Sequence, residues 1–292
     1  MTLATGFTDL WQLASVQRAA VALVLGAIGL PIVGVIIIGL DIMPVRFAMM
    51  HVALLGIAVG MLTGLDPLLC ALVACAASGA ALTPLARSPS GLSGAMGLLM
   101  SLAIAGALLV LSVAGVNANG AFELLWGSIL ATRRSDVVLL GVLAVLVPLV
   151  FVLRRRQVAL VLHDRELAAC SGVRVDRLTL VLLVLVAVAV AAGIRLTGAL
   201  LVDALTLLPA LAARRIANSL PGMVAAAVTV GMVVNIIGFV LAVQLDLPPG
   251  PVLVLSAGAV ALAVHVLPDG RTSGWRSSRE SGSPASDSAS LH

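Results

Sequence analysis

The stretch from Ala19 to Leu40 reads AAVALVLGAIGLPIVGVIIIGL and contains no charged side chain. The hydrocarbon core of a bilayer is about 30 Å thick, so a helix that crosses it needs roughly 20 apolar residues. The strands of a membrane β-barrel are about ten residues long and alternate in polarity, so they do not produce an apolar run of this length. This stretch therefore predicts a membrane-spanning α-helix.

The composition extends the same prediction to the whole chain. Of 292 residues, 61% are hydrophobic and only 10% are charged, whereas a soluble globular protein has about 45–50% apolar and about 25% charged residues. These values exclude an ordinary water-soluble enzyme and a disordered chain. Three cysteines are too few for a disulfide scaffold. We expect an all-α, polytopic membrane protein.

Nine apolar stretches are long enough to cross a bilayer as helices. The seventh is short and contains Asp203 and Pro209, so eight full crossings fit the sequence as well. The stretches define a transmembrane domain over residues 18–268, between an N-terminal segment 1–17 and a polar tail 269–292 that we expect to be disordered. The nine predicted spans are 18–40, 43–64, 67–86, 92–114, 136–153, 178–196, 197–213, 223–243 and 250–268.

The basic residues indicate topology and exclude one kind of catalytic site. All 17 are arginines, and a P-loop needs a lysine to reach the β- and γ-phosphates, so an ATPase of that type would have to be a separate subunit. The arginines lie at span ends and in loops, which argues against a nucleic-acid partner. The loop 154–177 holds six of them and is predicted to be cytoplasmic. Arg133 and Arg134 then fall outside, and the stretch 121–132 before them could be an interfacial or re-entrant helix.

The loop 154–177 also contains the sequence HDRELAACSGV at residues 163–173. Asp164 is a residue type favoured at a helix N-cap, and Glu166 suits the first turn of a helix. Gly172 suits the position just after a helix end. These signals predict a short amphipathic helix outside the membrane. Such a helix is either a solvated interfacial element or a rigid lever that docks into a cytoplasmic protein.

The pattern formed by Glu166, Ala168 and Gly172 resembles the coupling-loop motif of ABC importer permeases. The run DRELAACSGV is similar to the corresponding loop of the ABC-3 permeases, the group that imports zinc, manganese and iron. Four further stretches are similar to that family, and the resemblance covers roughly residues 15 to 268. These stretches are LWGSIL at 125–130, TGALLV at 197–202, LLPA at 207–210 and LDLPPGP at 245–251.

The resemblance implies the membrane-spanning permease subunit of an ATP-driven ABC importer in a bacterial plasma membrane. It implies a permease homodimer that carries two cytoplasmic ATPases and receives a divalent metal ion from an extracytoplasmic binding protein. ATP hydrolysis then belongs to the partner, so the chain is not an enzyme, and the zinc, manganese or iron ion is cargo with no permanently bound cofactor. Asp164, Glu166, Ala168 and Gly172 are expected to form the coupling helix.

One position departs from the family pattern. The family commonly carries an acid four residues before a histidine on the second span, so that both side chains share a helix face and can bind a divalent cation. Here the histidine is His51, but the acid is replaced by Phe47. Asp203 is an acidic side chain well inside a predicted span, where a carboxylate is costly. We hypothesise that His51 and Asp203 bind the metal, although His51 could instead make an interhelical hydrogen bond and Asp203 a salt bridge with Arg195.

Two alternatives stay open. Loss of the acid at Phe47 is compatible with the same machinery carrying a metal chelate or another small nutrient. A proton-coupled secondary transporter with Asp203 as the proton carrier is the other alternative. That class commonly shows an inverted internal repeat, which the sequence does not display.

Overall fold

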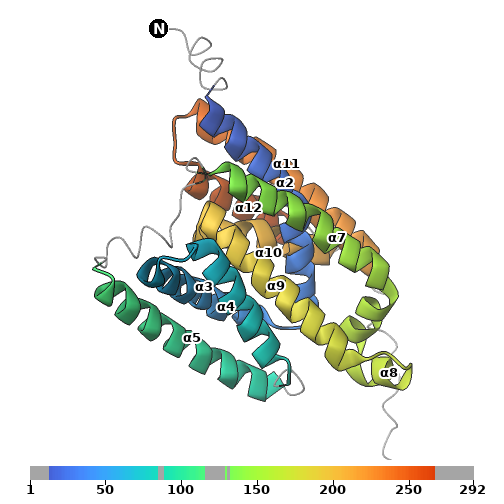
Figure 1. Cartoon of the computed structure of the whole chain (residues 1–292). Helices are drawn as coiled ribbons and strands as arrows, with labels where there is room; N and C mark the ends of the chain where they lie inside the picture. Colours follow the sequence, from blue (N-terminus) through green and yellow to red (C-terminus); the bar gives the residue numbers. More distant parts are fainter. Residues whose placement is uncertain (1–12, 85–88, 116–128, 130–131, 267–292) are drawn as a thin grey trace, which may run out of the picture.

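A computed structural model describes residues 13–84, 89–115, 129 and 132–266 of the chain. Within these residues the regular secondary structure is helical, which confirms the all-α prediction. In this part of the chain, nine long helices and the short helix α8 form an elongated bundle (Figure 1). The helices are α2 (Ala14–Gly39), α3 (Met43–Thr63), α4 (Pro67–Leu82), α5 (Pro89–Val113), α7 (Arg134–His163), α8 (Arg165–Cys170), α9 (Val175–Thr197), α10 (Ala199–Ile216), α11 (Leu220–Gln244) and α12 (Pro249–Val266).

The nine long helices correspond in order to the nine predicted spans. Among the described residues, seven of them have the length and hydropathy needed to cross a membrane. Helix α4 is a shorter apolar helix of 16 residues, and α10 has 18 residues with Arg214 and Arg215 in its last turn. The predicted segment 1–17 lies largely outside the described residues, although α2 already begins at Ala14. The predicted tail 269–292 lies wholly outside them.

The fifth predicted span proved longer than the sequence suggested. We placed its end at residue 153, but α7 continues to His163 and has 30 residues. The continuation 154–163 reads RRRQVALVLH and contains no glycine or proline that would end a helix. Val158 and Val161 on this continuation are buried, so packing against the bundle holds the extra turns in place. The first part of the predicted loop 154–177 is therefore helical.

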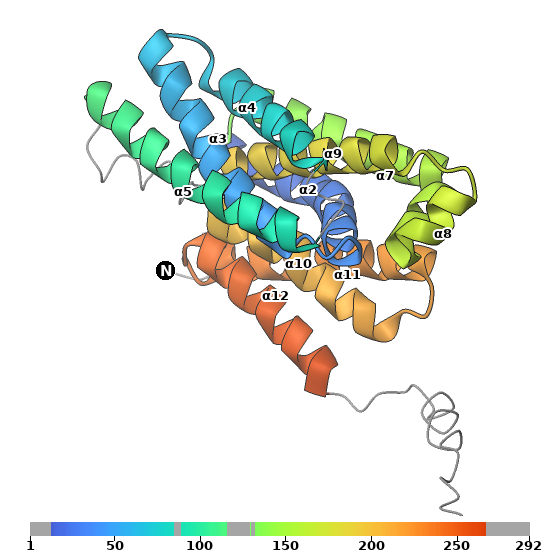
Figure 2. The ribbon, with the colours of Figure 1, turned by 90° about the horizontal axis from the view of Figure 1, so that it is seen from below.

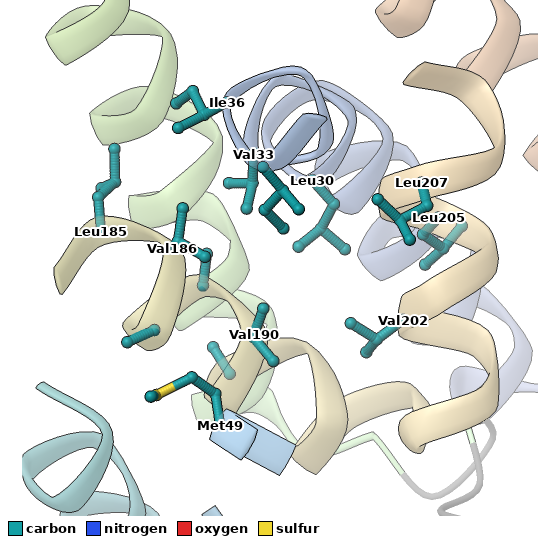
Figure 3. Packing of buried hydrophobic residues seen from close by; sticks show 14 of the residues in the cluster. Leu30, Val33, Ile36, Met49, Leu185, Val186, Val190, Val202, Leu205 and Leu207 are labelled. Carbon is teal, nitrogen blue, oxygen red and sulfur yellow. The ribbon is translucent and has the colours of Figure 1, made fainter. Parts of the chain in front are cut away.

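Helix α2 is the central element of the bundle. It packs against α7, α9, α10 and α11, and 78% of its most apolar window is buried inside the protein. In Figure 3, Leu30 and Val33 of α2 point into the interior between α9, which carries Val190, and α10, which carries Val202. All four side chains are buried. Lipid cannot reach this part of α2, so α2 is surrounded there by the side chains of other helices.

A single glycine allows α2 and α10 to approach closely. A Cβ atom built on Gly34 would lie 1.9 Å from the backbone carbonyl oxygen of Thr206. No backbone movement of a few tenths of an ångström could accommodate such a contact. Close approach through small residues is a common way for membrane helices to associate, because the bilayer supplies no hydrophobic force between them.

The positions of the arginines distinguish the two ends of the bundle. One end carries α8, the arginines at 154–156 and the α10–α11 turn after Arg214 and Arg215 (Figure 2). Helix α5 ends and α7 begins on the side away from α8 (Figure 1). We infer from the positive-inside rule that the α8 end faces the cytoplasm. The stretch 121–132 before α7 lies outside the described residues, apart from Ile129 and Thr132.

The contact between α2 and α10 generates a prediction. Gly34→Ala should lower the stability of the folded permease by about 1–3 kcal/mol, because the new methyl group forces the two helices apart. Gly97→Ala is the matched control, because a Cβ atom at Gly97 in α5 meets no atom within 4 Å. Thermal unfolding of the two purified variants in detergent measures the difference. Equal melting temperatures would contradict the role assigned to Gly34.

Candidate functional site

The short helix α8 is held at its start by Asp164. One carboxylate oxygen of Asp164 accepts hydrogen bonds from the backbone N–H groups of Glu166 at 2.8 Å and Leu167 at 3.1 Å. These donors have no partner inside the helix, so an N-cap side chain supplies what the first turn lacks. The backbone of Asp164 is extended and separates α8 from the end of α7 at His163. The predicted N-cap is thus present.

The end of α8 is a Schellman motif centred on Gly172. The N–H of Gly172 donates to the carbonyl of Ala169, and the N–H of Val173 donates to the carbonyl of Ala168, each at 3.1 Å. Gly172 has φ +78°, a left-handed conformation that costs a residue with a Cβ atom about 1–2 kcal/mol. Both ends of this six-residue helix are therefore capped.

One face of α8 is anchored to the bundle. Ala168 is fully buried and belongs to the main hydrophobic cluster, and Val173 packs against the same cluster. Arg165 donates from Nη2 to the Thr179 hydroxyl on α9 at 3.4 Å. Helix α8 packs on both α7 and α9. A displacement of α8 would consequently act on two long helices.

The other face of α8 is exposed. Glu166, Ala169 and Cys170 are open to solvent, and 56% of the Leu167 surface is accessible. The outer face of α8 thus presents one large apolar side chain, Leu167, beside the carboxylate of Glu166. No role for Leu167 or Val173 was predicted from the sequence. Val173 could have been found, because a hydrophobic residue directly after the C′ glycine usually contacts the last turn of the helix.

His51 lies in the interior on α3. It is 7% exposed, and its Nδ1 atom is 2.7 Å from the backbone carbonyl oxygen of Phe47. A carbonyl oxygen can only accept, so Nδ1 carries the proton, and in a neutral ring Nε2 has a free lone pair. An imidazole in this tautomer can bind a transition metal through Nε2. The hydrogen bond to Phe47 explains the orientation of the ring without any interhelical partner.

The Phe47 side chain cannot act as a metal ligand. Its side chain is 41% exposed, and the Arg46 guanidinium carbon lies 4.2 Å from the centre of its ring. This is a cation–π contact. A phenyl ring paired with a cation supplies no oxygen for a metal.

Asp203 lies within α10, but its side chain and that of Arg195 are outside the described residues. The salt bridge considered between them therefore stays a hypothesis. Thr206, one turn further on, is buried and donates to the Val202 carbonyl of its own helix at 2.7 Å. Helices α3 and α10 both pack against α9. In the described part of the chain, no three histidine, cysteine, aspartate or glutamate side chains are grouped so that they could hold a metal.

Comparison with known proteins gives consistent matches along most of the chain. The ABC 3 transport family matches residues 12–267. A probable metal transport system membrane protein of Thermotoga maritima is 28% identical over 71% of this chain and 73% of its own length. The zinc transport system membrane protein TroC of Treponema pallidum is 32% identical over 53% of this chain and 50% of its own length. The manganese import system permease protein ScaB of Streptococcus parasanguinis is 28% identical over 86% of this chain and 88% of its own length.

Solved structures share the fold. The PsaBC structure from Streptococcus pneumoniae, determined with a Fab, superposes with a TM-score of 0.78 over 91% of this chain and 96% of the other, at 23% identity. An ABC transporter described as metal-chelate type, in an inward-facing conformation, gives a TM-score of 0.67 at 19% identity over 86% of each chain. The family match and the membrane-spanning helices confirm the resemblance: this chain belongs to the ABC 3 transport family and is a multi-span permease of the plasma membrane.

Proposed function

We propose that this permease imports a divalent transition metal, zinc, manganese or iron, and that a separate cytoplasmic ATPase drives it through α8. The observation that carries the proposal is the doubly capped α8, anchored on one face and exposed on the other at the arginine-rich end. The chain has no lysine for a P-loop, so ATP hydrolysis falls to a partner. Relatives named for zinc and manganese transport support the choice of cargo.

The four residues of the coupling helix have distinct roles in this proposal. Asp164 and Gly172 hold the two ends, Ala168 fixes the inner face, and Glu166 lies on the outer face with Leu167. Because α8 is rigid, it can transmit a movement of its partner without unfolding. Helix α7 extends for 30 residues from α8 to the opposite end of the bundle, so it can carry that movement across the membrane. A second copy of the permease and an extracytoplasmic binding protein complete the proposed importer.

His51 and Asp203 are the proposed pathway residues. A neutral imidazole nitrogen and a carboxylate are both ligands for zinc, manganese and iron. The free Nε2 lone pair of His51 supports its assignment, while Asp203 is assigned from its position inside a membrane helix. A metal chelate is the second candidate cargo, because Phe47 stands where an acid would strengthen binding of a bare ion.

The docking role of α8 is tested by Leu167→Asp. Loss of the apolar contact and burial of an unpaired carboxylate should reduce copurification of the ATPase subunit by about tenfold or more. Leu247→Asp is the matched control: Leu247 is 47% exposed and lies in the α11–α12 turn at the opposite end. Copurification from a strain that expresses both subunits is the measurement. Normal recovery of the ATPase with Leu167→Asp would refute docking through this face.

The pathway is tested by His51→Ala and Asp203→Asn. Each should reduce metal accumulation by about tenfold or more, because a ligand to the transported ion is lost. His265→Ala is the control, since His265 makes a similar hydrogen bond to the carbonyl four residues earlier, at 3.0 Å, but lies exposed at the end of α12. Cellular zinc, manganese and iron are measured by mass spectrometry in a complemented deletion strain.

Two results would count against the bare-ion pathway. Unchanged accumulation in His51→Ala and Asp203→Asn would remove these residues from it. Uptake of a supplied chelate, with no uptake of the free ion, would favour the second cargo.

A further inference from the structure

A pocket of about 470 Å³ lies beside α8, between the inner ends of α7 and α9. It has an apolar part from both helices and a basic part at their cytoplasmic ends. None of the lining residues in the described part of the chain is acidic. The apolar part consists of Val150, Leu153, Leu178 and Val181, and the polar part of Arg154, Gln157, Gly172, Arg174 and Arg177.

The pocket lies at the depth of the inner membrane interface. Helix α7 begins at Arg134 near the outer end, and about 20 residues of helix bring it to Leu153, a rise of about 30 Å that equals the hydrocarbon thickness. The arginines at 154–156 follow at once. Arg174 directly precedes α9, and Arg177 lies in its first turn. The three arginines of the pocket are therefore placed where lipid headgroups are, and its apolar residues where acyl chains begin.

The apolar part of the pocket opens outward. Leu153 is 71% exposed and Val181 is 43% exposed. Side chains this apolar and this accessible, at the end of a membrane span, face lipid. The guanidinium of Arg154 donates from Nη1 to the Gln157 side chain at 3.0 Å, which keeps the Arg154 head beside its own helix.

We propose that this pocket binds an anionic phospholipid of the cytoplasmic leaflet. The phosphate lies among Arg154, Arg174 and Arg177. The part of an acyl chain nearest the headgroup lies along Leu153 and Val181. Guanidinium groups bind phosphate through paired hydrogen bonds, and no lining carboxylate competes with the lipid. The cytoplasmic leaflet supplies anionic lipids to basic pockets of this kind. A free phosphate ion would leave the apolar part of the pocket uncovered.

The bound lipid would contact the junction between α8 and α9, because Gly172 lines the same pocket. Gly172 ends α8, and Arg174 precedes the first residue of α9. The lipid would brace this junction, and that consequence rests on the proposed coupling role of α8. Binding of the lipid itself does not depend on it, so the test uses the permease alone, without ATPase or metal.

The test compares two double variants with the same loss of charge. Arg174→Gln with Arg177→Gln removes two arginines of the pocket. Arg133→Gln with Arg134→Gln removes two exposed arginines at the start of α7, at the opposite end. Native mass spectrometry of the full-length protein counts retained phosphatidylglycerol and phosphatidylcholine after matched loading in detergent.

The wild type and the Arg133/Arg134 variant should retain phosphatidylglycerol over phosphatidylcholine. The Arg174/Arg177 variant should bind phosphatidylglycerol about tenfold more weakly or worse, while eluting as the same folded species. Equal retention of the two lipids by the wild type would overturn the proposal, as would equal retention by the two variants. Displacement of the lipid by millimolar inorganic phosphate would show a simple anion site instead.

Discussion

Within the hydrocarbon core there is no water to hydrogen bond the backbone, so every N–H and C=O group must find its partner inside the protein. An α-helix meets this requirement within each span, and the described secondary structure of this chain is helical throughout. The consequence is that chain reversals are confined to the two ends of the bundle. The turn at Asp66, which caps α4 through the N–H groups of Leu68 and Leu69, lies at one end. Helix α8, with its own caps, lies at the other.

Helix α8 lies at a solvent-exposed end of the bundle and is stabilised in another way. A six-residue helix has few internal hydrogen bonds, so it is stable only because Asp164, Gly172 and the burial of Ala168 compensate. Ala168, Val173 and Arg165 connect α8 to the bundle, while the outer face of α8 is exposed. An element built in this way is suited to receive force from another protein and to pass it to α7 and α9. The neighbouring basic pocket places lipid headgroups against the same junction.

Features determined by neighbouring residues could be predicted from sequence. The apolar runs located the spans, and the residue types of Asp164 and Gly172 located both ends of α8. Features that depend on distant residues could not be predicted. The close contact of Gly34 with the Thr206 carbonyl joins positions far apart in the chain, and no local pattern reveals it. The continuation of α7 was not predicted, because the polar run RRRQ at 154–157 interrupts the apolar sequence, whereas the helix continues through it.

The site residues show the same division. A histidine at position 51 suggested a metal ligand from sequence alone. Its tautomer became evident only from the hydrogen bond to the Phe47 carbonyl in the structure. The pocket beside α8 was not predicted, because its arginines come from two helices and looked like topology signals in the sequence. Asp203 was identified from the cost of a carboxylate in a membrane span, and its role stays a prediction.

In the proposed importer, the energy for transport comes from ATP hydrolysis by a partner that docks on α8. The most direct test reconstitutes the permease, its ATPase and its binding protein in liposomes, and follows entry of zinc, manganese and iron with a metal-sensitive dye. One of these metals should accumulate only when ATP is present on the α8 side, and accumulation should be lost when the ATPase is omitted. Equal accumulation driven by a proton gradient, with no ATPase present, would contradict this proposal.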